Sequence, residues 1–97
     1  MIITEIRIRK TFSEGNLKAV VSLTLDNCLA IHDIKVIQTG NKTFVAMPNH
    51  KHEDGIYRDI IHPIFPKLRN DFESEILAAY EKYIALQDVM ASEDAKS

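Results

Sequence analysis

The chain has 97 residues, of which 45% are apolar and 27% charged, and its formal net charge at pH 7 is −2. This composition excludes a disordered chain, and the length is that of one domain. A slightly negative chain also excludes a protein that attracts polyanions over its whole surface, so any anion-binding face has to be local. Residues 63–97 hold the acidic excess, with seven Asp or Glu against four Lys or Arg.

The cysteine content and the start of the chain bear on the compartment. The single cysteine, Cys28, has no partner within the chain, which fits a reducing compartment. The start Met-Ile-Ile-Thr-Glu lacks the basic segment and the apolar run of a signal peptide, and no stretch approaches the roughly 18 apolar residues of a membrane span. We therefore expect a cytoplasmic protein.

Two alternating runs open the chain. In residues 2–11 isoleucines alternate with polar side chains, which predicts a half-buried strand with Arg7 and Arg9 on the same side. Residues 17–25 alternate in the same way. The residues between the two runs include Gly15, which suits a turn, so the sequence predicts a hairpin.

A third strand is predicted over residues 29–37, after a turn at Asp26-Asn27. Its alternation slips by one residue at His32-Asp33, the only polar pair inside this apolar run. A slip of one residue moves every later side chain to the other face of a sheet. We therefore expect a bulge or bend at His32-Asp33, or else a strand that is buried on both faces.

The middle of the chain predicts two further strands. Residues 43–47 form the fourth. Residues 48–55 are polar and without a period, which indicates a loop, with a turn at Asp54-Gly55. Residues 56–61 form a short fifth strand, expected at an edge of the sheet.

From Lys67 the apolar period becomes helical, with a stripe made of Leu68, Phe72, Ile76, Ala79, Tyr80 and Tyr83. The start is open, because Pro66 suits a first helical position and Asn70 with Glu73 resembles a capping box. We expect the helix to end near Gln87 and residues 88–97 to form a frayed acidic tail. The fold class is thus α+β: one domain over residues 1–87, with a mainly antiparallel sheet of four or five strands followed by a long C-terminal helix.

The histidines are the first candidates for chemistry. His50 and His52 flank Lys51 in the polar loop, and the other potential metal ligands are Cys28, Glu53, Asp59 and His62. A structural metal site needs about four converging ligands, and this His-x-His pair has no matching second pair. A solvated loop is the better interpretation, and we expect no metal and no cofactor.

Catalysis has little support in the sequence. His32-Asp33 has the composition of an oriented general base, but no activated serine or cysteine stands nearby, and a polar pair that satisfies backbone groups at a bulge explains it better. His62-Pro63 is interpreted as a chain reversal between sheet and helix. No phosphate-binding loop, nucleophile elbow or zinc motif is present. We expect no enzyme and no small-molecule substrate.

Basic side chains are the remaining candidates. Lys67 and Arg69 stand at the start of the predicted helix, where backbone N–H groups and the helix dipole favour an anion. Lys51 and Arg58 flank the polar loop. The first hairpin carries Arg7, Arg9, Lys10 and Lys18. Such basic residues are commonly ordinary solvated surface. In a dimer, however, each cluster occurs twice about the two-fold axis, an arrangement that suits binding to the phosphates of a nucleic acid.

Several separated motifs also agree with a known family. Residues 23–37 read LTLDNCLAIHDIKVI, and they are followed by FVAMP, DG, RDI and HPI, the last at residues 62–64. In order and spacing these motifs resemble the SpoVG (stage V sporulation protein G) family of small bacterial regulators, from Ile3 to about Tyr83. The resemblance implies a sheet followed by a C-terminal helix. It also implies homodimers that bind DNA or RNA and regulate gene expression, with roles in sporulation, septation and virulence.

The resemblance extends to particular positions. Nucleic-acid contact in the family involves basic residues at the start of the helix that follows the HP motif. Arg69 matches one of these basic positions here, and Lys67 is close by. Lys51 matches a basic position in the loop after the MP motif, and His50 stands at a neighbouring position that is often basic. Asp71 departs from the pattern, because it occupies a second position that is often basic and an acid there repels phosphate.

These observations predict a cytoplasmic, homodimeric regulator that binds DNA or RNA through Lys67, Arg69 and Lys51, aided by Arg7 and Arg9. We expect the dimer to form through an edge strand or an exchanged helix. The alternative is a protein-interaction regulator of cell division or sporulation that docks through the acidic face of the helix and has little affinity for nucleic acid. A metal-assisted hydrolase is a third and weaker interpretation.

Overall fold

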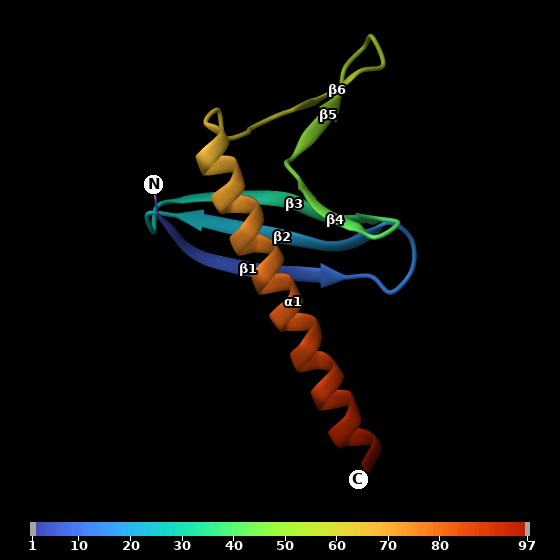
Figure 1. The fold of residues 1–97 in the computed structure, drawn as a ribbon. Helices are drawn as coiled ribbons and strands as arrows, with labels where there is room; N and C mark the ends of the chain where they lie inside the picture. The colour runs from blue at the N-terminus through green and yellow to red at the C-terminus, as the bar shows by residue number, and fades with distance from the viewer. Residues whose placement is uncertain (1, 97) are drawn as a thin grey trace.

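The computed structural model describes residues 2–96, with side chains described through residue 87. Its elements in chain order are β1 (Ile3–Thr11), β2 (Leu17–Leu25), β3 (Leu29–Thr39), β4 (Lys42–Ala46), β5 (Asn49–Lys51), β6 (Tyr57–Asp59) and α1 (Pro66–Lys96). Strands β1 to β4 form one antiparallel sheet in chain order, and β5 and β6 pair separately (Figure 1). The α+β class predicted from the sequence is confirmed.

The first hairpin forms as the alternation predicts. Strand β2 has the predicted bounds, and Ala19, Val21 and Leu23 on its inner face are fully buried. The turn before it uses Gly15 at a φ of 82°, which a residue with a side chain rarely adopts. Strand β1 has a register shift between Ile8 and Lys10, so Arg9 is an extra residue in its ladder.

The slip in β3 is a bulge, which decides between the two predicted alternatives. Val21 pairs with Ile34, and Leu23 pairs with Ile31. His32 and Asp33 therefore both stand opposite one residue of β2, Ser22. Asp33 has a φ of 62°, in the left-handed region that Asp tolerates better than most residues. The extra residue restores the inward direction of the later apolar side chains, so that Ile31 and Ile34 both enter the core.

The predicted fifth strand forms, but its predicted position at an edge of the main sheet is wrong. Tyr57–Asp59 does not join the edge of the main sheet but pairs with Asn49–Lys51, which the sequence assigns to a loop. Such pairing uses backbone groups only, so polar residues can form it without an apolar pattern. The predicted turn inside this hairpin is confirmed, with Gly55 at a φ of 82°.

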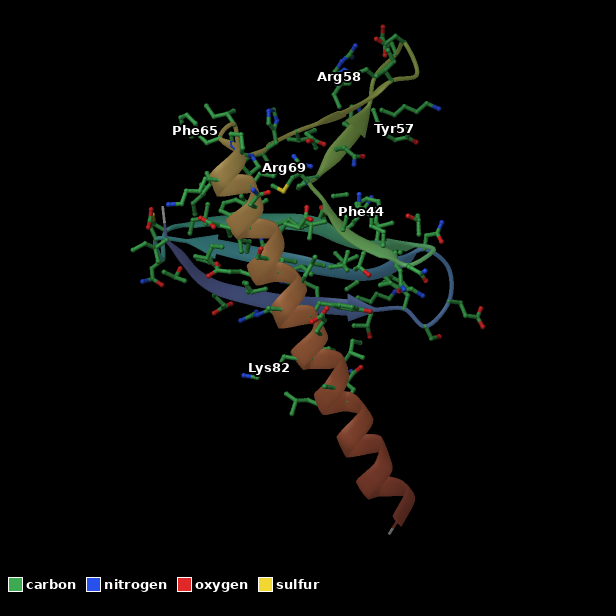
Figure 2. All side chains as sticks on the ribbon, viewed as in Figure 1. Phe44, Tyr57, Arg58, Phe65, Arg69 and Lys82 are labelled. Atoms are coloured by element: carbon green, nitrogen blue, oxygen red, sulfur yellow. The ribbon has the colours of Figure 1, made fainter. Side chains whose placement is uncertain are left out.

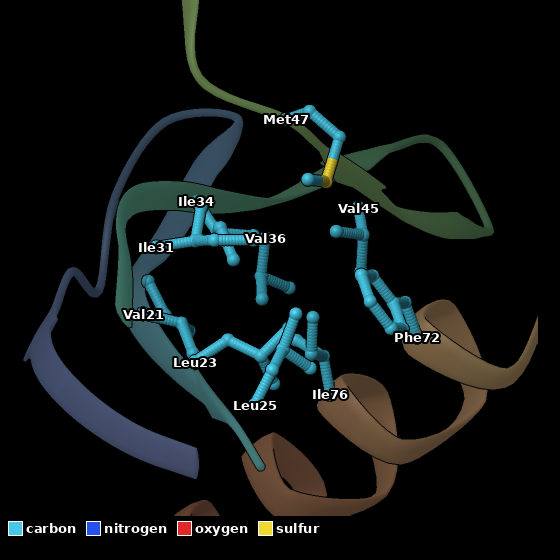
Figure 3. Packing of buried hydrophobic residues seen from close by; sticks show 11 residues of the cluster. Val21, Leu23, Leu25, Ile31, Ile34, Val36, Val45, Met47, Phe72 and Ile76 are labelled. Atoms are coloured by element: carbon cyan, nitrogen blue, oxygen red, sulfur yellow. The ribbon is translucent and has the colours of Figure 1, made fainter. Parts of the chain in front are cut away.

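Helix α1 lies across one face of the main sheet, and the core forms between them (Figure 1, Figure 3). Phe72 and Ile76 are 4% and 0% exposed and pack against the inner side chains of the strands. The helix starts at Pro66, which decides between the two predicted starts. Its predicted end at Gln87 is wrong, because residues 88–96 contain no glycine or proline and the helix continues to Lys96.

Candidate nucleic-acid interface

The start of α1 carries Lys67 and Arg69, both exposed, on two sides of the helix (Figure 2 labels Arg69). Residues two apart on an α-helix differ by about 200° around its axis. Accordingly, Lys67 lines one hollow together with Asp71, and Arg69 lines a different, small one together with Glu73. The structure therefore brings both cations to the helix start but on opposite sides of the buried Phe72.

The start of α1 favours an anion through its first turn but carries Asp71 and Glu73 one turn later. The first turn of α1 contains no acidic residue, so its free N–H groups and the positive end of the dipole face no carboxylate of that turn. Among the side chains of residues 2–87, the salt bridges are Arg7 to Glu5 at 3.3 Å and Arg58 to Asp54 at 2.9 Å. Neither involves Lys67, Arg69 or Lys51.

The β5–β6 hairpin holds the other predicted loop cations. Lys51 places its Nζ 5.9 Å from the centre of the Tyr57 ring, a cation–π distance. Arg58 instead donates to the Asp54 carboxylate at 2.9 Å. The Ile56 backbone N–H and then the Arg58 guanidinium hold the pKa of Asp54 below its ordinary value of 3.8. Arg58 is thus engaged within its own hairpin, whereas Lys51 remains exposed for an external anion.

Arg7 and Arg9 do not join the helix start. Arg7 stands opposite Ser22, a residue between two core positions of β2, so it points to the face of the sheet away from α1. Arg9 is the exposed extra residue of the β1 bulge. Arg7, which is predicted to aid the cations of the helix start, therefore lies on a different layer of the domain from them.

His32, His50 and His52 make contacts with neighbouring side chains of the domain. At the β3 bulge the His32 Nδ1 lies 2.9 Å from the Ser22 Oγ, which holds the ring against the neighbouring strand. The rings of His50 and His52 meet edge to face at 5.6 Å. Within the described residues, no three His, Cys, Asp or Glu side chains come together in a way that would hold a metal ion.

An apolar groove beside the helix start was missed by the sequence analysis. It has a volume of about 880 Å³ and lies between Leu29 of β3, the segment 61–65, and Leu68 of α1. His62 lines it too, together with Lys67 and Asp71. Large apolar side chains of this region are exposed: Ile64 and Phe65 within the segment at 75% and 66%, and Ile60 just before it at 70%. The signal was present in the sequence as an apolar run around Pro63, because a proline excludes a central strand and leaves these apolar side chains without a place in the main sheet.

The described residues thus define a small α+β protein: one helix across a four-stranded sheet, exposed cations at the helix start, and an apolar groove beside them. In this part of the chain no helix has a stretch long and apolar enough to cross a bilayer.

Comparison with known proteins identifies the family. The sequence model described as SpoVG matches residues 1–82. A relative from Clostridium botulinum, named "Putative septation protein SpoVG", is 52% identical over 89 residues, 92% of this chain and 98% of its own. Relatives of the same name from Clostridium acetobutylicum and Acetivibrio thermocellus are 54% and 52% identical over 84% and 88% of this chain, and 86% and 90% of their own. The chain belongs to the SpoVG family.

Proposed function

We propose that this protein is a non-enzymatic, homodimeric regulator that binds DNA or RNA and acts in septation or sporulation. The link to septation comes from the name of its relatives, which are about 52% identical. The observation that supports nucleic-acid binding most is the set of exposed cations at the start of α1 and on the β5–β6 hairpin, because Lys67, Arg69 and Lys51 form no salt bridge with a described carboxylate.

Charge and dipole act together at this helix start. Free backbone N–H groups and the positive helix end attract a phosphate, and a lysine or arginine in the first turn supplies a full charge beside them. Asp71 and Glu73 each follow a cation by one turn and reduce that attraction. A single helix start is therefore a weak site, and two copies in one assembly would raise the affinity.

The dimer accounts for the exposed apolar segment. Six of the large exposed apolar side chains lie within ten consecutive residues: Ile56, Tyr57, Ile60, Ile61, Ile64 and Phe65. Apolar surface gains about 25 cal/mol for each Å² removed from water, and concentrated patches of this kind mark interfaces. A second copy that covers this segment and its groove would supply burial that a thin core lacks.

Fluorescence anisotropy with duplex DNA, single-stranded DNA and RNA at several salt concentrations tests the nucleic-acid part. A dimer that makes about six to eight phosphate contacts gives a slope of log affinity against log salt of roughly −5 to −7 on duplex DNA. Arg69→Glu should weaken binding and flatten the slope. Lys82→Glu, the same charge change at an exposed site farther along α1, is the matched control (Figure 2). A wild-type chain with a flat salt response contradicts the proposal.

A second candidate is a protein-interaction regulator with little affinity for nucleic acid, and the open apolar groove favours it. Sedimentation or light scattering separates the two. If the wild-type chain is a dimer that Ile64→Asp converts to a monomer, a second copy occupies the groove. If the wild-type chain is already a monomer, the groove is free for a different protein and the homodimer proposal fails.

A further inference from the structure

The main sheet has two faces, and α1 covers only one of them. The covered face carries Val21 and Leu23 of β2, which are fully buried. Side chains alternate along a strand, so Val20 and Ser22 point to the opposite face. Within residues 2–96 no second layer lies on that side, and the β5–β6 hairpin stands off one end of the sheet (Figure 1). We call this side the open face.

Strand register aligns side chains in rows across the open face. One row runs through all four strands: Lys10 pairs with Val20, Val20 with Lys35, and Lys35 with Ala46. Neighbouring strands are about 4.8 Å apart, so the backbones of the two lysines are separated by roughly 10 Å. Along this row Val20 therefore has a cation on each side, and Ala46 follows the second cation.

The adjoining rows continue this arrangement. Arg7 stands opposite Ser22, whose hydroxyl is only 2.9 Å from the His32 ring on the next strand. On the other side, Ile37 pairs with Phe44, and both are half-buried on a face that no element of residues 2–96 covers. The open face thus has an aromatic and apolar floor with basic side chains among and around it.

The charge of the open face differs in sign from that of the chain. Its cations are Arg7, Lys10, Lys35 and Lys42. Its carboxylates are Glu5, which lies 3.3 Å from Arg7, and Asp33 at the bulge. The face therefore has more cations than carboxylates, whereas the whole chain has 12 Lys or Arg against 14 Asp or Glu.

From this arrangement we infer that the open face binds single-stranded nucleic acid, with Lys10 and Lys35 on the phosphates and the Phe44 ring stacked on a base. The inference rests on the proposed function and adds a second site to the helix start. A duplex keeps its bases stacked inside and would meet only the basic side chains. A single strand can also place its bases on Val20, Ile37 and Phe44, as aromatic platforms on sheets allow.

The test measures anisotropy with oligo-dT and oligo-U of about 12 nucleotides, a length within the range of single-strand sites, and with a duplex. Phe44→Leu keeps an apolar side chain but removes the stacking ring, and should weaken single-strand binding by about fivefold or more. Lys35→Gln should lower the steepness of the salt slope by about 0.7 for a single strand. Phe44→Leu should leave duplex binding unchanged, because a duplex meets only the basic side chains of this face, and Lys82→Gln should change neither kind of binding.

The outcomes separate this inference from the proposed function. If the wild-type chain binds single strands and both open-face variants bind them equally well, the inference is overturned while the proposed function stands. If the wild-type chain binds no nucleic acid, both fail. If Phe44→Leu changes a dimer into a monomer, the open face belongs to a second copy and the inference is again overturned. Thermal unfolding shows whether Phe44→Leu is folded, and otherwise Lys35→Gln decides alone.

Discussion

Replacement of Ile76 by alanine should remove much of the free energy that holds α1 on the sheet. Ile76 is 0% exposed and belongs to the core cluster that joins the helix to the strands (Figure 3). The change deletes three carbon groups, worth about 0.8 kcal/mol each in transfer from water. The cavity that remains adds to this, so we expect a loss of about 3 to 4 kcal/mol in the free energy of unfolding.

Urea denaturation followed by circular dichroism measures this loss, with the slope against urea as a check on two-state behaviour. The matched control is Leu86→Ala, which also shortens an aliphatic side chain on α1 but at a position that is 55% exposed. It should cost less than about 1 kcal/mol. Equal losses for the two variants at the same protein concentration would show that α1 does not pack on the sheet as described here.

Three further predictions concern local structure. Asp33→Gly should be more stable than Asp33→Ala by about 1 kcal/mol in thermal unfolding, because the φ of 62° is strained for alanine. Ser22→Ala should cost about 1 kcal/mol and shift the His32 ring nitrogen resonances, since the 2.9 Å contact is lost. The pKa of Asp54 measured by NMR should lie below 3.8, and Arg58→Gln should raise it only in part because the Ile56 N–H remains. A lowered folded-state pKa stabilises the hairpin above pH 3.8, and this contribution is lost as the pH falls through the folded pKa.

The parts of the fold with a strict apolar period were predictable from the sequence. Strand β2 has the predicted bounds, and the one-residue slip at His32-Asp33 predicted the bulge because a half-buried strand cannot change faces otherwise. The β5–β6 hairpin was not predictable, because Asn49–Lys51 pairs through backbone groups and buries little.

The exposure of the candidate site residues was predictable from the sequence, but their layout was not. Lys67, Arg69 and Arg7 are all exposed, as expected. Their separation depends on which side of α1 meets the sheet and on which face of β1 is covered, and both follow from long-range packing rather than from local pattern. The pairing of Arg58 with Asp54 likewise depends on a hairpin that the sequence did not reveal.

The layout also determines which cation is the cleaner probe of nucleic-acid binding. Lys67 lines the apolar groove, so a second copy that fills the groove would cover or displace its side chain. Arg69 is exposed on the other side of the helix, beside Val45 and Glu73, and does not line the groove. A charge reversal at Lys67 would therefore disturb the proposed dimerisation and the proposed phosphate contact together. A charge reversal at Arg69 should change the proposed phosphate contact alone, so a loss of affinity at Arg69 without a change in oligomeric state is the observation that would separate the two functions proposed for this helix start.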